Sequence, residues 1–270
     1  MTDPVVRDVD VVSQGGSYGS PEVIRETADG KRIVLFDDSV NGNNFSTAIA
    51  NAGENTTVIL NGDYTGVNSV TTVQQGQQIL GAANLKVKTP SGRTISITTP
   101  SASLSGTGSI GGSGSFRFFD MADNSSLIGV KAKITNSFSA IIARIEGKDN
   151  VKILNNTLTS EVSSFTPGIL EIRNSRNVTI RNNNMNVIAN AADGYVISFV
   201  DNNANIDFSN NSLNIGGTAP TLRTYLLTGG VTINNLSGTG NTSNLVTCYI
   251  SGGYTITGSI ETNGNNLCPP

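Results

Sequence analysis

Acidic residues and arginines alternate along a repeated segment in the middle of the chain, where they could act as acids and bases on a bound substrate. When the repeats are aligned, the charges fall into two columns, two residues apart. The first column contains Asp120, Arg144, Glu171 and Phe199, and the second contains Ala122, Glu146, Arg173 and Asp201. If neighbouring copies stack in register, each charge lies beside an opposite charge, both along and across one face.

This cluster has two interpretations. Carboxylates beside guanidinium groups can provide acid–base chemistry on a glycan. Alternatively, the charges form a surface lattice that fixes the register, in which each exposed pair contributes about 0–1 kcal/mol. We favour the lattice, because charges neutralised in pairs make poor catalysts, and we predict no catalytic residue. The candidate surface or glycan-contact cluster contains Asp120, Arg144, Glu146, Glu171, Arg173 and Asp201.

The composition argues against several kinds of site. The 270 residues include no His and no Trp, so the commonest general base, transition-metal ligand and aromatic sugar platform are absent. A net charge of −3 gives no basic footprint for nucleic acid, and no apolar run approaches the length of a membrane helix. We therefore predict no metal, no cofactor, no nucleic-acid partner and no membrane insertion of this segment. Tyr195 and Tyr225 are candidate sugar platforms, with ordinary packing as the alternative.

The elements that would position the cluster belong to a repeat. A phrase of the form Asn-Val-Thr-Ile-Arg-Asn-Asn is anchored at Val151, Val178 and Ile206, in steps of 178 − 151 = 27 and 206 − 178 = 28 residues. Fainter copies are expected at Leu127 and Val231. A period of this size, built from short strands and polar turns, indicates stacked coils. The three anchors should stack in one inward row within an array of three parallel sheets.

A second column lies five residues after each anchor. It contains Asn156, Asn183 and Asn211. Asn tolerates the left-handed conformation and can hydrogen-bond to itself along a stack. This column therefore predicts a structural asparagine ladder at a tight corner.

The chain divides into a lead-in, residues 1–36, and a solenoid, residues 37–270. Chain length and coil size predict roughly nine to eleven coils. A single convincing helix is expected over Asn44–Ala52, where Phe45, Ala48, Ile49 and Ala52 share one face. It is well placed to cover the exposed edge of the first coil.

The two cysteines, Cys248 and Cys268, lie 20 residues apart near the end of the chain. This is about one short coil, so the two thiols could stack within disulfide reach. We predict a disulfide and an oxidising compartment, with two unrelated thiols as the alternative.

The phrase Asn177–Met185 resembles the coil repeat of right-handed parallel β-helices of the pectate-lyase-like architecture, and Asn44–Thr65 resembles the capping helix and first strand of that superfamily. The resemblance covers roughly residues 44–260. It implies an all-β fold, a single-stranded right-handed parallel β-helix (solenoid) with an N-terminal capping helix. This scaffold carries lyases, hydrolases, phage tailspikes and adhesins. The His and the Asn-Thr-Asp phrase of the polygalacturonase-like signature are both missing here.

A narrower resemblance lies in Pro4–Val12, which is similar to the segment after the translocator barrel of intimin- and invasin-like inverse autotransporters. Gln77–Gly81, Thr89–Thr94 and Asn124–Val130 resemble β-helical passengers of bacterial surface proteins. These likenesses imply an extracellular passenger segment, anchored to the outer membrane through an upstream barrel domain of the same chain. It would act as a rigid stalk or adhesive surface that contacts glycan or a cell-surface protein. The alternatives are a carbohydrate-active enzyme, either a polysaccharide lyase or a glycoside hydrolase, and a phage tailspike fragment.

Overall fold

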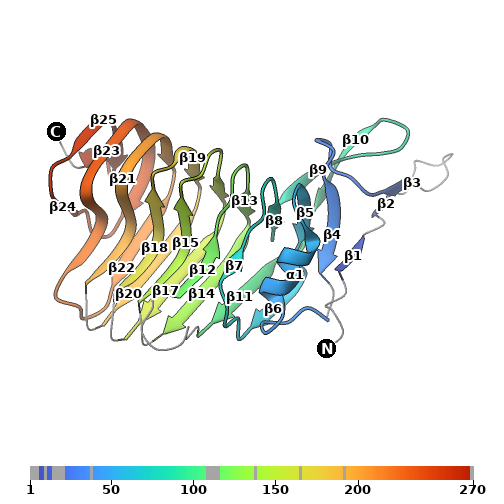
Figure 1. Ribbon diagram of the computed structural model, residues 1–270, viewed down its shortest axis with the longest axis horizontal. Helices are drawn as coiled ribbons and strands as arrows, with labels where there is room; N and C mark the ends of the chain where they lie inside the picture. The colour runs from blue at the N-terminus through green and yellow to red at the C-terminus, as the bar shows by residue number, and fades with distance from the viewer. Residues whose placement is uncertain are drawn as a thin grey trace.

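The chain folds as a parallel β-solenoid of about eight turns with very little helix. The computed structural model describes residues 6–8, 11–13, 22–36, 39–107, 116–136, 139–163, 166–190 and 193–267. Figure 1 shows the coils stacked along the longest axis of the molecule, with the N-terminal and C-terminal coils at opposite ends. The predicted all-β parallel solenoid is therefore confirmed.

Three parallel sheets form the walls of the solenoid, and several long strands turn a corner and contribute to more than one. Sheet 1 contains β4 (Arg32–Phe36), β5 (Thr56–Ile59), β8 (Gln78–Leu80), β13 (Ser126–Ile128), β16 (Lys152–Leu154), β19 (Arg176–Arg181), parts of β21 (Gly194–Ser209) and β23 (Leu222–Ser243), and β25 (Thr255–Thr262). Sheet 2 contains β6 (Gly62–Thr65), β11 (Ala102–Gly106), β14 (Val130–Asn136), β17 (Thr157–Val162), β20 (Asn184–Ala189), β22 (Ser212–Gly216) and the end of β23. Sheet 3 contains β7 (Thr71–Thr72), β12 (Phe116–Asp120), β15 (Ala140–Glu146), β18 (Pro167–Arg173), the first parts of β21 and β23, and β24 (Cys248–Ser251).

The predicted anchors form one inward row. Val178 pairs with Ile206, and the Thr179 backbone N–H donates to the carbonyl oxygen of Val151 on the preceding coil. All three anchor side chains are fully buried in the single core that runs through the coils. The 27- and 28-residue steps therefore gave the correct register for the central coils.

The two fainter anchors were misplaced. Leu127 pairs with Ile153, two residues after the anchor, and the buried Ser125 occupies the anchor position. Strand side chains alternate with a period of two, so an apolar residue two positions away fits the same pattern. At the other end, Ile206 pairs with Leu236 and not with Val231.

An antiparallel hairpin leaves the stack near the N-terminal end. It is formed by β9 (Asn84–Lys88) and β10 (Thr94–Thr98), shown beside β3 (Glu22–Ile24) in Figure 1. Its buried Leu85 and Val87 form a second, external cluster with side chains of the first coils, including Ile33, Ile59 and Leu80. Because these residues build a hairpin and not a coil, the prediction of nine to eleven coils was too high.

Helix α1 (Phe45–Ala52) buries the predicted face, and Phe45 packs against Phe36 and Tyr64. It lies beside β7, the first strand of sheet 3, where Ser46 Oγ and Thr71 Oγ1 are 2.8 Å apart. Whether α1 caps the fold stays a prediction.

Arg32–Phe36, predicted to belong to the lead-in, already pairs in parallel, since β4 pairs with β5. Three further strands lie at the ends: β1 (Val6–Asp8) pairs antiparallel with β4, β2 (Val11–Ser13) with β3, and β26 (Asn265–Leu267) with β25. No helix in the described part of the chain is long and apolar enough to cross a membrane.

Candidate functional site

The corner between sheets 3 and 1 carries an exposed column of asparagines, one immediately before each anchor position. We call it the outer asparagine row. Its members are Asn124, Asn150, Asn177, Asn205 and Asn235. All have positive φ, between 53° and 61°, a backbone region that Asn tolerates better than most residues. The residue before the anchor therefore adopts the same backbone conformation on five successive coils.

Hydrogen bonds link the row along the solenoid. Asn150 Nδ2 donates to Asn124 Oδ1 at 3.1 Å, and Asn235 Nδ2 donates to Asn205 Oδ1 at 3.0 Å. Asn177 Nδ2 instead donates to Asp149 Oδ1 at 2.7 Å. A series of amide groups thus faces solvent at the strand spacing, about 4.8 Å.

The predicted ladder lies at the next corner, between sheets 1 and 2. Asn156, Asn183 and Asn211 are buried there, and Asn241 extends the column by one coil. The left-handed conformation is adopted by the residue before each ladder member, for example Asn182 before Asn183. In each Asn-Asn pair, one residue turns the chain and the next forms the ladder.

A groove of about 550 Å³ lies beside the outer asparagine row, and two members of the row, Asn124 and Asn150, line it. It takes one or more residues from each of six successive coils, a span of about 24 Å at the usual strand spacing. The polar side chains that line it are Gln75, Asp123, Asn124, Lys148, Asp149, Asn150, Asn174, Ser175, Arg176, Asn202, Asn203 and Asn234. The groove was not predicted from the sequence, although the Asn before each anchor was a visible signal of the row.

Two carboxylates line the groove on adjacent coils. Asp149 Oδ2 lies 3.2 Å from Arg176 Nε. Asp123 Oδ1 accepts the backbone N–H of Asp149 at 2.7 Å. Within the described ranges, no group of three or more acidic or thiol side chains is arranged to hold a metal ion.

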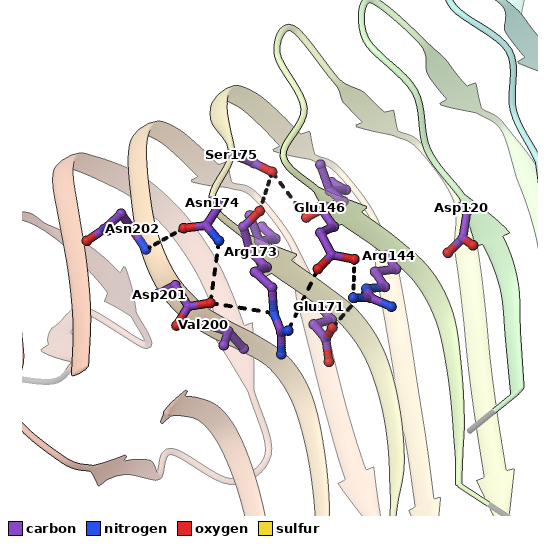
Figure 2. A network of polar contacts seen from close by, with 12 residues as sticks. Asp120, Arg144, Glu146, Glu171, Arg173, Asn174, Ser175, Val200, Asp201 and Asn202 are labelled. Atoms are coloured by element: carbon purple, nitrogen blue, oxygen red, sulfur yellow. Dashed lines mark hydrogen bonds and ion pairs between the residues drawn. The ribbon is translucent and has the colours of Figure 1, made fainter. Parts of the chain in front are cut away.

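Five of the six predicted cluster residues form one ion-pair network beside the groove (Figure 2). Arg144 pairs with Glu146, and its Nε lies 3.1 Å from Glu171 Oε1. Arg173 lies 3.7 Å from Glu146 and 3.8 Å from Asp201. Each carboxylate in this network therefore has an arginine partner.

Asp120 is outside the network. It is in register with Arg144, as predicted, but its carboxylate pairs with Arg117 of its own strand, 3.0 Å away. Figure 2 shows it on a neighbouring coil with no contact to the other labelled side chains.

The end of each charged column was misassigned by one residue. Glu171 pairs with Ser198 and Arg173 pairs with Val200, whereas Phe199 points into the core. The distance along the chain from Glu171 to the anchor Val178 is 178 − 171 = 7 residues. From Ser198, the partner of Glu171, to the anchor Ile206 it is 206 − 198 = 8 residues. Arg173 pairs with Val200 and Arg176 with Ala204, so the extra residue lies in the corner between Val200 and Ala204. Asp201 follows Val200 as Asn174 follows Arg173, both with positive φ, and its carboxylate still reaches Arg173.

A smaller pocket of about 270 Å³ adjoins the charged cluster. Its lining includes Arg117, Asp120, Arg144 and Glu146, together with Lys148, which also lines the groove. The two hollows therefore meet at Lys148.

The two candidate tyrosine platforms are not available. Tyr195 and Tyr225 are buried, and burial raises the pKa of both hydroxyls. The hydroxyl of Tyr225 lies 3.0 Å from Thr262 Oγ1. In contrast, Tyr249 is 45% exposed, with the Arg223 guanidinium 4.1 Å from its ring centre.

Cys248 lies in β24 and packs against the end of the core. Cys268 lies outside the described residues, so the Cys248–Cys268 disulfide stays a prediction.

The fold and the groove define the chain as a parallel β-solenoid with a polar groove along one corner. No protein-family model and no curated protein matches it. Among solved structures it is similar to an alginate lyase from Paenibacillus sp. str. FPU-7, with a TM-score of 0.26 and 12% identity over 80% of this chain and 97% of the other. It is also similar to the Dettilon tailspike protein, with a TM-score of 0.27 and 9% identity over 83% of this chain and 68% of the other. At such low TM-scores, neither likeness identifies a function.

Proposed function

We propose that this chain is a rigid extracellular β-solenoid that binds a linear glycan along the groove at the corner between sheets 3 and 1. The observation that carries the proposal is the groove itself, which crosses six coils and is lined mainly by amide side chains. Amides both donate and accept hydrogen bonds, as sugar hydroxyls do. A polymer aligned with the solenoid axis would meet a similar set of amides at each coil.

Some of these amide side chains make no hydrogen bond within the protein, which supports a role in binding a ligand. Among the described residues, the exposed Asn202 and Asn234 have no hydrogen-bond partner for their side chains, and both line the groove. Groups of this kind can bind a ligand without first breaking a contact inside the protein. The parallel coils hold them in fixed positions, which lowers the entropy cost of binding.

The ion pairs of the carboxylates in the charged cluster favour a binding function over a catalytic one. Every carboxylate of the predicted cluster pairs with an arginine, and general acid–base catalysis needs a group free to exchange a proton. One observation favours a second candidate, a carbohydrate-active enzyme: Asp123 and Asp149 line the same groove on adjacent coils. Glycoside hydrolases use a pair of carboxylates.

We further propose that the chain is a passenger segment of a bacterial surface protein, held at the outer membrane through an upstream barrel domain of the same chain. This proposal is supported by the resemblance of short segments, such as Pro4–Val12, to segments of intimin- and invasin-like inverse autotransporters. The full-length coding sequence tests it, since an upstream segment that lacks a barrel would contradict it.

The glycan proposal is tested by titrating the protein with a panel of soluble neutral and acidic polysaccharides and following the heat of binding. The double variant Asn202→Ala, Asn234→Ala should bind about tenfold or more weakly, because each lost hydrogen bond contributes about 0.5–1.5 kcal/mol. Asn68→Ala is the matched control, an exposed asparagine at the corner between sheets 2 and 3. Equal affinities for all three proteins would contradict binding in this groove. New reducing ends or unsaturated products would instead support the enzyme.

A further inference from the structure

Lys148 lies where the groove meets the smaller pocket, and its ammonium group has no ion-pair partner among the described residues. Lys148 lines both hollows and is half-buried. Among the described residues, no carboxylate lies within ion-pair distance of its Nζ. The arginines around it differ in this respect, since Arg117, Arg144, Arg173 and Arg176 each pair with a carboxylate.

The backbone holds this lysine at a fixed place on the corner. The N–H of Lys148 donates to Ser175 Oγ at 3.1 Å. The preceding Gly147 has a φ of 62°, and its N–H donates to the carbonyl oxygen of Arg173 on the next coil at 2.9 Å. Both contacts tie the segment to the neighbouring coil.

The charges around Lys148 leave one positive charge in excess on the side of the smaller pocket. That pocket is lined by three cations, Arg117, Arg144 and Lys148, and by two carboxylates, Asp120 and Glu146. Both carboxylates pair with arginines. On the side of the groove, Asp149 pairs with Arg176, and Asp123 accepts a backbone N–H.

We propose that Lys148 is an anion subsite, and that the polymer bound in the groove is an acidic polysaccharide with a carboxylate or a sulfate on the sugar unit at this junction. The inference rests on the proposed glycan-binding function and specifies the class of glycan. An ammonium–anion contact in a partly enclosed pocket is stronger than a neutral hydrogen bond and is weakened by salt. The neighbouring amides would bind the uncharged hydroxyls of the same chain.

The test measures binding of polygalacturonate, dextran sulfate and uncharged dextran to the 270-residue protein at low and at physiological salt. We expect one of the two acidic polymers to bind more tightly than dextran, and the preferred one identifies the anion. Lys148→Gln should lose about tenfold in affinity for that polymer, as expected for a hydrogen bond to a charged group. Its affinity should also depend less on salt, whereas Lys148→Arg should retain most of the binding.

Lys131→Gln is the matched control, because Lys131 is an exposed lysine on sheet 2 with no ion-pair partner among the described residues. It should bind as the wild type does, and thermal unfolding should show that each variant is folded. Equal binding of dextran and the acidic polymers, or an unchanged affinity in Lys148→Gln, would overturn the anion subsite and leave the glycan groove standing. If no polymer binds at all, the proposed function fails, and the subsite fails with it.

Discussion

Asn183 Oδ1 accepts two hydrogen bonds from Asn156 on the preceding coil, one from the backbone N–H at 2.9 Å and one from Nδ2 at 3.0 Å. Asn183 Nδ2 in turn donates to Asn211 Oδ1 and to the carbonyl oxygen of Ile153. One buried side chain thus connects three coils, in a core where polar groups are costly without partners. The ladder ties each coil to its neighbours.

Replacing Asn183 by Ala should destabilise the protein by about 3–5 kcal/mol, because several buried donors and acceptors lose their partner together. Chemical denaturation followed by circular dichroism measures the change. Asn184→Ala is the matched control, one residue further along but exposed, and it should change stability by less than about 0.5 kcal/mol. Similar losses in the two variants would show that the ladder is not a special source of stability.

The external hairpin should stabilise the first coils. Val87 is fully buried in the cluster that contains Ile33 and Ile59. Val87→Asp would place an unpaired charge there, so the first coils should become sensitive to protease and exchange their amide protons faster. Lys88→Asp, at the exposed neighbouring position, is the control and should leave exchange unchanged. Loss of protection only in the C-terminal coils would contradict this role.

The central coils were predictable from sequence because their repeat length is nearly constant. Steps of 27 and 28 residues between Val151, Val178 and Ile206 bring like residues together on successive coils. The copy on the N-terminal side was misplaced because its anchor position is not apolar. Ser125 is polar at a buried anchor position, so the apolar Leu127 was chosen in its place.

The candidate site was only partly predictable, for a related reason. Alternating charges pointed to Arg144, Glu146 and Arg173, whose contacts lie on regular strands. Counting back from the anchor Ile206 assigned Asp201 to the charged column, but one extra residue in the corner before the anchor moves Val200 into that position. The groove is lined by residues from six successive coils, so no single repeat of the sequence shows it.

The fold should lose stability at high pH through its buried tyrosines. Burial raises the pKa of Tyr225, and the hydrogen bond with Thr262 partly opposes this effect. The raised pKa means that the neutral hydroxyl is favoured in the folded state. The contribution is therefore fully present below about pH 10, the ordinary tyrosine pKa, and is lost as the pH rises above it.

The measurement is the free energy of unfolding between neutral pH and strongly alkaline pH. In Tyr225→Phe its decrease with pH should be smaller by up to about 1.4 kcal/mol per pH unit, the value for one proton. Since only slopes are compared, the Thr262 hydrogen bond lost at all pH values does not affect the result. Identical slopes for the two proteins would rule out Tyr225 as a source of the alkaline effect.

The predicted disulfide between Cys248 and Cys268 is tested by mass spectrometry of unreduced protein after treatment with a thiol-alkylating reagent. We expect no alkylation before reduction and two modified thiols after it. A closed loop of this length stabilises a fold by roughly 3 kcal/mol in the chain-entropy model, so reduction should lower the melting temperature. Two modified thiols in the unreduced protein would show that the bond is absent.

Glu171 separates the binding function from the catalytic one. Its carboxylate lies beside Arg144, which also pairs with Glu146 and would keep that partner in Glu171→Gln. Partly exposed pairs contribute about 0–1 kcal/mol, so we expect a small loss of stability and unchanged affinity for the glycan. Asn202→Ala with Asn234→Ala, in the groove, should show the opposite result, with weaker binding and unchanged stability. If the wild type cleaves any polysaccharide and Glu171→Gln does not, the ion-pair network is an active site, and the chain is an enzyme and not a binding surface.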